Sequence, residues 1–215
     1  MGDAIRRASA TEIWPLIHEQ RNKLGELLET LSDAEWVTPS LCHEWQVRDV
    51  VAHCIQTHLV TPWSLIGDWI GSGFSLRARN DRGVARRRSQ SPPELLSDYR
   101  ATAGRASAPP GQLTYVLVEA VIHGEDIARP VGRRIDVAPQ SLITVVEICR
   151  NTDPILHGKE RSAGLTLRAS DVAWSAGAGP EVTGPLASII LAITGRQSAL
   201  DDLSGKGLDT LRSRA

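Results

Sequence analysis

The sequence predicts a mainly α-helical protein, with a helical bundle followed by a small α+β module. Up to about residue 150, apolar residues recur at the three- to four-residue spacing of amphipathic helices. Beyond about residue 160, short alternating segments bounded by glycine and proline are typical of strands and turns. We therefore divide the 215 residues into a helical domain at 1–150 and an α+β domain at 151–215.

Caps and helix-stopping residues delimit the helices of the first domain. Ser9 or Thr11 can cap the first helix, and Ser91 can cap a later one. Pro130 and Gly132 stop the helix that precedes them. Helices are expected at residues 9–31, 47 to the high fifties, 91–106, 113–129 and 138–150, with one helical turn at 32–36.

The stretch at 71–90 is rich in glycine and arginine and has no periodicity, which predicts a mobile connection. Whether the preceding helix continues past Pro62 with a bend is left open. The stretch holds the strongest charge run of the chain: Arg77, Arg79, Arg82, Arg86, Arg87 and Arg88. Two interpretations apply, a solvated loop or a lid whose arginines bind an anionic substrate.

The second domain reads as three short strands and three short helices. The strands are expected in "GLTLRAS", "VAWSAG" and "GPEVTG". The helices are expected in "PLASIILAITGR", "SALDDLSG" and "GLDTLRSRA".

Composition excludes several classes of protein. The net charge of −1, and the absence of aromatic residues among the arginines, argue against nucleic-acid binding. The N-terminal residues hold no apolar signal core and the apolar runs are too short to span a bilayer, so we expect a cytoplasmic protein with no membrane partner. Cys42, Cys54 and Cys149 are isolated, which argues against a cysteine zinc site or a disulfide framework.

The helix at 113–129 is apolar almost all round, yet Glu119, His123 and Asp126 fall within about 60° of one another on it. Buried carboxylates and imidazoles are costly unless they are paired or bind a metal. A buried Glu–His ion pair would give the same pattern, so this stripe alone does not decide between the two.

A second apolar helix supplies a further polar pair, with Asp49 four residues before His53. Zinc accepts imidazole nitrogen and carboxylate oxygen, and catalytic zinc sites typically keep three protein ligands and an open position. We therefore predict His53, Glu119 and His123 as metal ligands. Asp49 and Asp126 are predicted to orient the imidazoles.

"TPSLCHEWQVRDVVAHC" followed by "EAVIHGEDIARPVG" resembles the mycothiol-dependent maleylpyruvate isomerase family, within the DinB-like bundle superfamily. The tail from "LRASDVAWSAG" to "DDLSGKG" resembles the C-terminal module of that family, so the match spans nearly the whole chain. The resemblance implies a DinB-like four-helix bundle with an α+β appendage, and His53, Glu119 and His123 match the metal ligands of the family. It also places Arg196 near the substrate. Gln46 departs from the family pattern, because many relatives have Ser or Thr there as a helix cap.

The resemblance implies a divalent metal, Zn²⁺ by the nature of the ligands, with mycothiol as cosubstrate and a small electrophile as substrate. A thiol at the open metal position becomes a nucleophilic thiolate. The thiolate can add to an activated double bond and then leave, which isomerises that bond between cis and trans. It can instead displace a leaving group, which joins the thiol to the substrate through sulfur. The rival hypothesis is a non-enzymatic metal-binding or regulatory module, whose site a fourth protein ligand would close. The substrate, the native metal and the choice between monomer and homodimer stay open.

Two further predictions concern the site. No cysteine of the chain is expected to be the nucleophile, and Cys42 is the one nearest to the expected cleft. The C-terminal module is expected to fold onto the bundle and help wall the site, because a module of its size forms only a marginal core alone.

Overall fold

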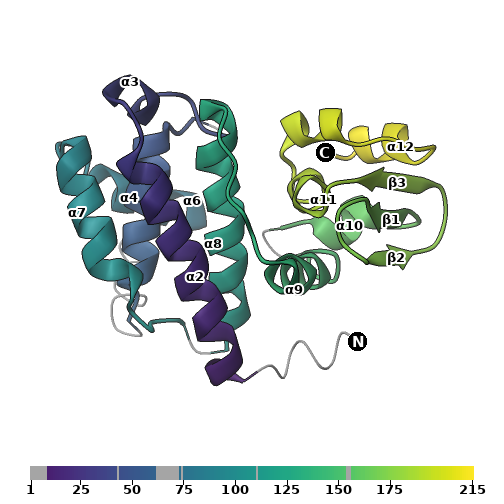
Figure 1. Ribbon diagram of the computed structural model, residues 1–215, viewed down its shortest axis with the longest axis horizontal. Helices are drawn as coiled ribbons and strands as arrows, with labels where there is room; N and C mark the ends of the chain where they lie inside the picture. The colour runs from purple at the N-terminus through teal and green to yellow at the C-terminus, as the bar shows by residue number, and fades with distance from the viewer. Residues whose placement is uncertain (1–8, 43, 62–72, 74, 110, 154–155) are drawn as a thin grey trace. The chain divides into compact units, whose positions relative to one another are not determined.

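The computed structural model describes residues 9–42, 44–61, 73, 75–109, 111–153 and 156–215 (Figure 1). Backbone contacts divide these residues into two compact units, 9–136 and 137–215. The predicted fold class is confirmed, since the first unit is helical and the second combines helices with a three-stranded sheet. None of the described helices is long and apolar enough to cross a membrane.

Four helices form the frame of the first unit: α2 (Ala10–Glu29), α4 (Val47–His58), α7 (Pro92–Ala103) and α8 (Leu113–Ala128). Helix α2 packs on α7 and α8, and α4 packs on the same two helices, so the four close on one another (Figure 1). The shorter elements are α3 (Asp33–Trp36), α6 (Leu76–Ala85), which packs on α4, and the 3₁₀ turn η1 (Arg129–Val131).

Capping explains where these helices begin. Ser32 and Ser91 each start a helix and bond to the glutamate three residues later, Glu35 and Glu94. The 3₁₀ turn after α8 ends at Gly132, whose φ of 68° is the left-handed conformation that glycine adopts readily. Helix α4 lies at the centre of the main core, with Val47, Val50, Val51 and Ile55 all fully buried.

The prediction of a mobile connection at 71–90 is wrong over most of its described part, because α6 forms there. Ser75 caps this helix by accepting a hydrogen bond from the Ala78 amide at 3.2 Å. An i,i+4 pair between Arg77 and Asp81 adds to it at 3.9 Å. The open question of a helix past Pro62 lies outside the described residues.

The second unit contains α9 (Pro139–Cys149), α10 (Gly158–Ser162), β1 (Thr166–Ala169), β2 (Ser175–Gly177), β3 (Glu181–Gly184), α11 (Leu186–Ile193), η2 (Gln197–Asp202) and α12 (Leu208–Arg212). The sheet order is β2-β1-β3, with β1 antiparallel to β2 and parallel to β3. Leu167 pairs with Val182 at the centre of the parallel ladder. The buried helix α11 packs on α9 and on the sheet, and forms the middle of this unit.

The boundary between the units differs from the one expected at residue 150, because α9 belongs with the second unit. Helix α9 packs on α11. Its Glu147 also accepts a hydrogen bond from the indole nitrogen of Trp174, just before β2, at 3.0 Å.

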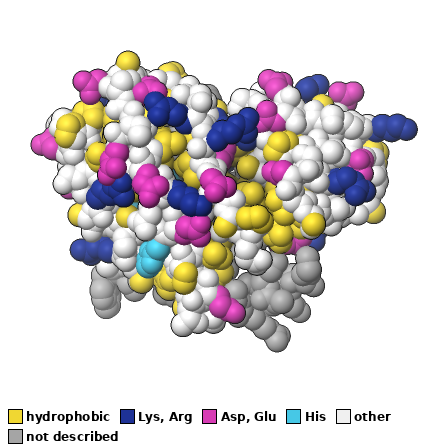
Figure 2. All heavy atoms as spheres, viewed as in Figure 1, with side chains coloured by type: hydrophobic (Ala, Val, Ile, Leu, Met, Phe, Trp, Pro, Cys, Tyr) yellow, Lys and Arg dark blue, Asp and Glu magenta, His cyan; other side chains and the backbone are white. Residues whose placement is uncertain are grey.

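Charge is mixed on the surface. Figure 2 shows lysine and arginine side chains interspersed with aspartate and glutamate side chains over the face that it draws. This mixture agrees with the net charge of −1.

Candidate metal centre

The polar stripe of α8 lies in an otherwise apolar helix. Its neighbours Val118, Val121 and Ile122 are buried in the unit. Glu119 and His123 are one turn apart, so both side chains leave the helix on one side.

Helix α4 brings His53 to the same place. The His53 Nε2 atom lies 3.9 Å from Oε1 of Glu119. The rings of His53 and His123 meet edge to face, with 5.0 Å between their centroids. One donor atom from each of His53, Glu119 and His123 lies within 4.8 Å of the others. The structure therefore brings together the three side chains predicted as ligands, from two helices that pack on each other.

Asp126 lies under this cluster with its side chain fully buried. Its Oδ2 atom is 2.9 Å from Nδ1 of His123, which fixes the ring and leaves Nε2 for other contacts. Cys42 donates its thiol proton to the same carboxylate oxygen at 3.0 Å, and its sulfur is 3.7 Å from Nδ1 of His123. The contact places Asp126 beside His123, the imidazole that it is predicted to orient.

The loop before α4 is tied to α8 at the same point. The amide of Leu41 donates to the carbonyl of Asp126 at 3.2 Å, which brings Cys42 to the cluster. Further along the loop, the ring of Trp45 packs on His53 with 5.2 Å between centroids. Sequence reasoning missed Trp45, although its place before the capped helix was visible in the sequence.

Electrostatics separate the two imidazoles. Burial, together with the positive charges of His123 and Arg79, lowers the pKa of His53 to about 3, so this ring is neutral. Burial also lowers the pKa of His123, but hydrogen bonds to Asp126 and Cys42 outweigh it and raise the pKa well above its usual range. Burial raises the pKa of Glu119, although its side chain keeps 41% of its surface exposed.

Asp49 does not take the place predicted for it. Its carboxylate accepts a hydrogen bond from the Gln46 amide at 3.0 Å and so caps the start of α4. Within the described part of the chain, the buried Nδ1 of His53 has no hydrogen-bond partner. The first backbone amides of a helix have no partner within it, so a carboxylate near the helix start accepts a hydrogen bond from them. This explains why Asp49 bonds to the backbone there and not to His53.

The remaining predicted residues lie as follows. Arg196 belongs to the second unit and donates from its guanidinium to the carbonyl of Thr194 at 3.0 Å. Cys54 and Cys149 are buried, and burial raises the pKa of their thiols to about 11 and about 12. Neither thiol is therefore ionised near neutral pH.

Two imidazoles and one carboxylate form a donor set that suits a catalytic zinc ion. The neutral ring of His53 and the exposed part of Glu119 fit such a site, since a ligand imidazole must be unprotonated and an open position must face solvent. His123, whose pKa is raised, would have to release its Nε2 proton to bind the ion. Cys42, His123 and Asp126 form a second group with donor atoms this close. Their mutual hydrogen bonds account for that group without an ion.

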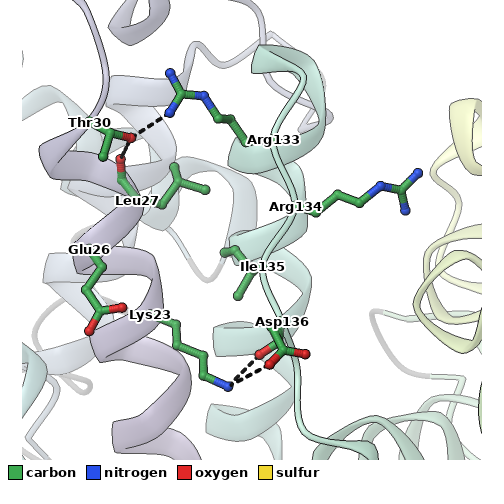
Figure 3. Close-up of a pocket in the computed structure, with 8 residues that line it drawn as sticks. All are labelled: Lys23, Glu26, Leu27, Thr30, Arg133, Arg134, Ile135 and Asp136. Carbon is green, nitrogen blue, oxygen red and sulfur yellow. Dashed lines mark hydrogen bonds and ion pairs between the residues drawn. The ribbon is translucent and has the colours of Figure 1, made fainter.

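A groove of about 410 Å³ lies elsewhere on the first unit, between α2 and residues 133–136 (Figure 3). Three of its charged side chains, Lys23, Arg133 and Asp136, already have partners. Lys23 bonds to Asp136 and to Glu19, and Arg133 donates to Thr30 at 2.7 Å. The groove has no cluster of nucleophilic or metal-ligating groups among its lining residues, so the cluster on α4 and α8 is the better candidate site.

Comparison with known proteins relates part of the helical unit to a described family. Residues 17–114 match the family described as Mycothiol maleylpyruvate isomerase N-terminal domain. The matched residues all lie in the helical unit. The match includes His53 and ends before Glu119, so the residues on α8 rest on the geometry given above.

Two solved structures share the fold over both units. One is the crystal structure of the mycothiol-dependent maleylpyruvate isomerase, and the other is that of its histidine-to-alanine mutant. Each is 17% identical to this chain, with a TM-score of 0.64, over 94% of this chain and 95% of the other. No curated protein sequence matches the chain.

Proposed function

We propose that the protein is a divalent-metal-dependent enzyme that uses mycothiol as an external thiol, as an isomerase or as an S-transferase. The observation that carries the proposal is the convergence of His53, Glu119 and His123 in a unit that matches the mycothiol maleylpyruvate isomerase N-terminal domain family over residues 17–114. Maleylpyruvate, named for the solved relatives, is the first substrate to test.

Each residue of the site has a distinct part in this proposal. His53, Glu119 and His123 would hold the metal, which when bound supplies a Lewis acid that ionises a thiol at neutral pH. Asp126 would hold the Nδ1 proton of His123, which would leave Nε2 as the atom that binds the metal. Cys42 is occupied with Asp126 and is not needed as a nucleophile.

The test combines metal analysis with turnover. The purified protein, loaded with zinc, is given mycothiol and either maleylpyruvate or a panel of electrophiles. We expect about one zinc per chain and thiol-dependent isomerisation or conjugation. His123→Ala should lose both the zinc and the turnover. His18→Ala, the same substitution at a histidine of α2 outside the cluster, should keep both.

The rival function is a metal-binding module without catalysis. Stoichiometric zinc with no reaction of mycothiol toward any electrophile would favour it. A protein that takes up no zinc would refute both functions.

A further inference from the structure

The interface between α4 and α6 holds the buried amide of Gln56. Gln56 is 8% exposed, and neither its Oε1 nor its Nε2 has a hydrogen-bond partner within the part of the chain that the structure describes. Leaving such groups unsatisfied is costly, and native proteins rarely do so without a bound water or ligand. Gln56 is one turn after His53 on α4, so both side chains leave the helix within about 60° of each other.

A glycine makes room for this amide. A Cβ atom at Gly83 of α6 would lie 1.7 Å from Oε1 of Gln56, so any larger residue would force the amide to move. Gly83 is itself buried. The bare backbone of α6 therefore makes room for the amide group of Gln56.

Arg79 precedes Gly83 by one turn on α6, so the two residues share one face of that helix. Its Nε atom is buried and has no partner among the described residues. Because α6 packs on α4 and Gly83 lies against Gln56, this face of α6 is turned toward the helix that carries His53.

Two other arginines of the run are directed at carboxylates. Arg77 pairs with Glu44 and Asp81, and Arg87 lies 3.9 Å from Asp98. Arg79 and Arg87 each have a buried Nε without a hydrogen-bond partner among the described residues. Arg87 lies near the carboxylate of Asp98, whereas Arg79 shares the face of α6 that meets Gln56.

We propose that Arg79 and Gln56 form a carboxylate-binding subsite beside His53, Glu119 and His123. A guanidinium and an amide NH₂ supply N–H donors, and a carboxylate on the electrophilic substrate would satisfy them. The proposal deepens the proposed function and rests on it for the identity of the neighbouring centre. It selects electrophiles that carry a carboxylate over neutral ones.

The test measures binding of maleate, a small unsaturated dicarboxylate, by titration calorimetry on the full chain with and without zinc. Arg79→Gln should weaken maleate binding at least about tenfold, as expected when a charge-assisted hydrogen bond is lost. Arg88→Gln is the matched control, because Arg88 belongs to the same run and is exposed. It should bind maleate as the unchanged protein does. Dimethyl maleate, which has no charge, should bind with the same affinity to the unchanged protein and to Arg79→Gln.

A second variant separates binding from folding. Gln56→Met keeps the volume and removes both unsatisfied atoms, so the free energy of unfolding should hold or rise. Maleate affinity should nevertheless fall. A structural role for Gln56 alone would leave that affinity unchanged.

Several outcomes would overturn the subsite. These are no binding of maleate to the unchanged protein, equal weakening by Arg79→Gln and Arg88→Gln, and loss of zinc in Arg79→Gln with maleate affinity unchanged. Failure of the proposed function looks different. In that case no zinc binds or mycothiol does not react, while maleate still binds the metal-free protein in an Arg79-dependent way.

Discussion

The imidazole of His58 is buried at the end of α4, where its Nδ1 lies 3.1 Å from Oγ1 of Thr102 and its ring packs on Tyr99. Burial, together with the positive charge of Arg21, lowers its pKa from 6.5 to about 2. Below pH 6.5 the unfolded chain therefore binds a proton at His58 that the folded chain does not. The free energy of unfolding is therefore unaffected by this histidine above pH 6.5, and it decreases as the pH falls from 6.5 toward 2.

We predict that His58→Gln makes the free energy of unfolding less sensitive to acid. Between pH 7 and pH 5 the unchanged protein should lose about 2 kcal/mol more than the variant, because each pH unit below 6.5 costs about 1.4 kcal/mol. Urea unfolding at several pH values measures this difference. Parallel curves for the two proteins would contradict the prediction.

Cys42 allows a direct test of where the nucleophile comes from. Its thiol already donates to Asp126 at 3.0 Å, and serine at this position can make the same bond. We predict that Cys42→Ser keeps turnover with mycothiol within a few-fold of the unchanged protein, measured in a single-turnover assay. If the folded, zinc-loaded variant loses turnover, Cys42 becomes the leading nucleophile.

At single residues, sequence spacing predicts a shared helix face but not the direction of a side chain along it. The spacing of Glu119, His123 and Asp126 sufficed to expect them together, since one helix carries all three. Asp49 has equally good spacing from His53, yet the free amides at the start of α4 take its carboxylate. The sequence did not single out Gln56, because the lack of a hydrogen-bond partner among the described residues can be recognised only once the packing of α6 on α4 is known.

Among the elements, α9 and α10 meet so closely that a glycine is required. A Cβ atom at Gly158, in the first turn of α10, would lie 2.2 Å from the carbonyl oxygen of Cys149, the last residue of α9. Because that oxygen belongs to the backbone, it can move only if the helices shift.

We predict that Gly158→Ala lowers the free energy of unfolding by about 1–3 kcal/mol, as other overpacked substitutions do. Gly104→Ala is the control. Nothing lies within 4 Å of a Cβ atom at Gly104, whose φ is −79°, so this change should be neutral or slightly stabilising. Urea unfolding of both variants measures the difference. Equal stability of the two would refute the packing argument.

Helix α6 shows where periodicity fails as a guide. Only Gly83 and Val84 of its ten residues are buried, so it has no apolar stripe to detect. Its stability comes instead from the Ser75 cap and from charged pairs such as Arg77 with Asp81. Strongly amphipathic elements such as α2 and α4 were predictable to within a few residues, because packing follows their pattern.

At the scale of the whole molecule, the order of elements was predictable and the assignment of α9 was not. A sequence shows that 139–149 is an apolar helix, but not which neighbour covers it. The structure packs it on α11 and bonds its Glu147 to Trp174, which moves the unit boundary to residue 137. Such partners depend on contacts distant in sequence, which local patterns do not record.

The placement of the second unit on the first stays a prediction: we expect residues 137–215 to help wall the candidate centre, with Arg196 facing it. A nitroxide spin label on Cys42 tests this without requiring bound metal. Cys54 and Cys149 are buried, with thiol pKa values raised to about 11 and about 12, so Cys42 should be the cysteine that reacts. In NMR spectra, the amides of Gly195 and Arg196 should lose intensity relative to the same sample with its nitroxide reduced. If every amide of 137–215 keeps its full intensity, the second unit does not reach the site. The role of Arg196 would then fall, while His53, Glu119 and His123 would remain testable as ligands within the helical unit alone.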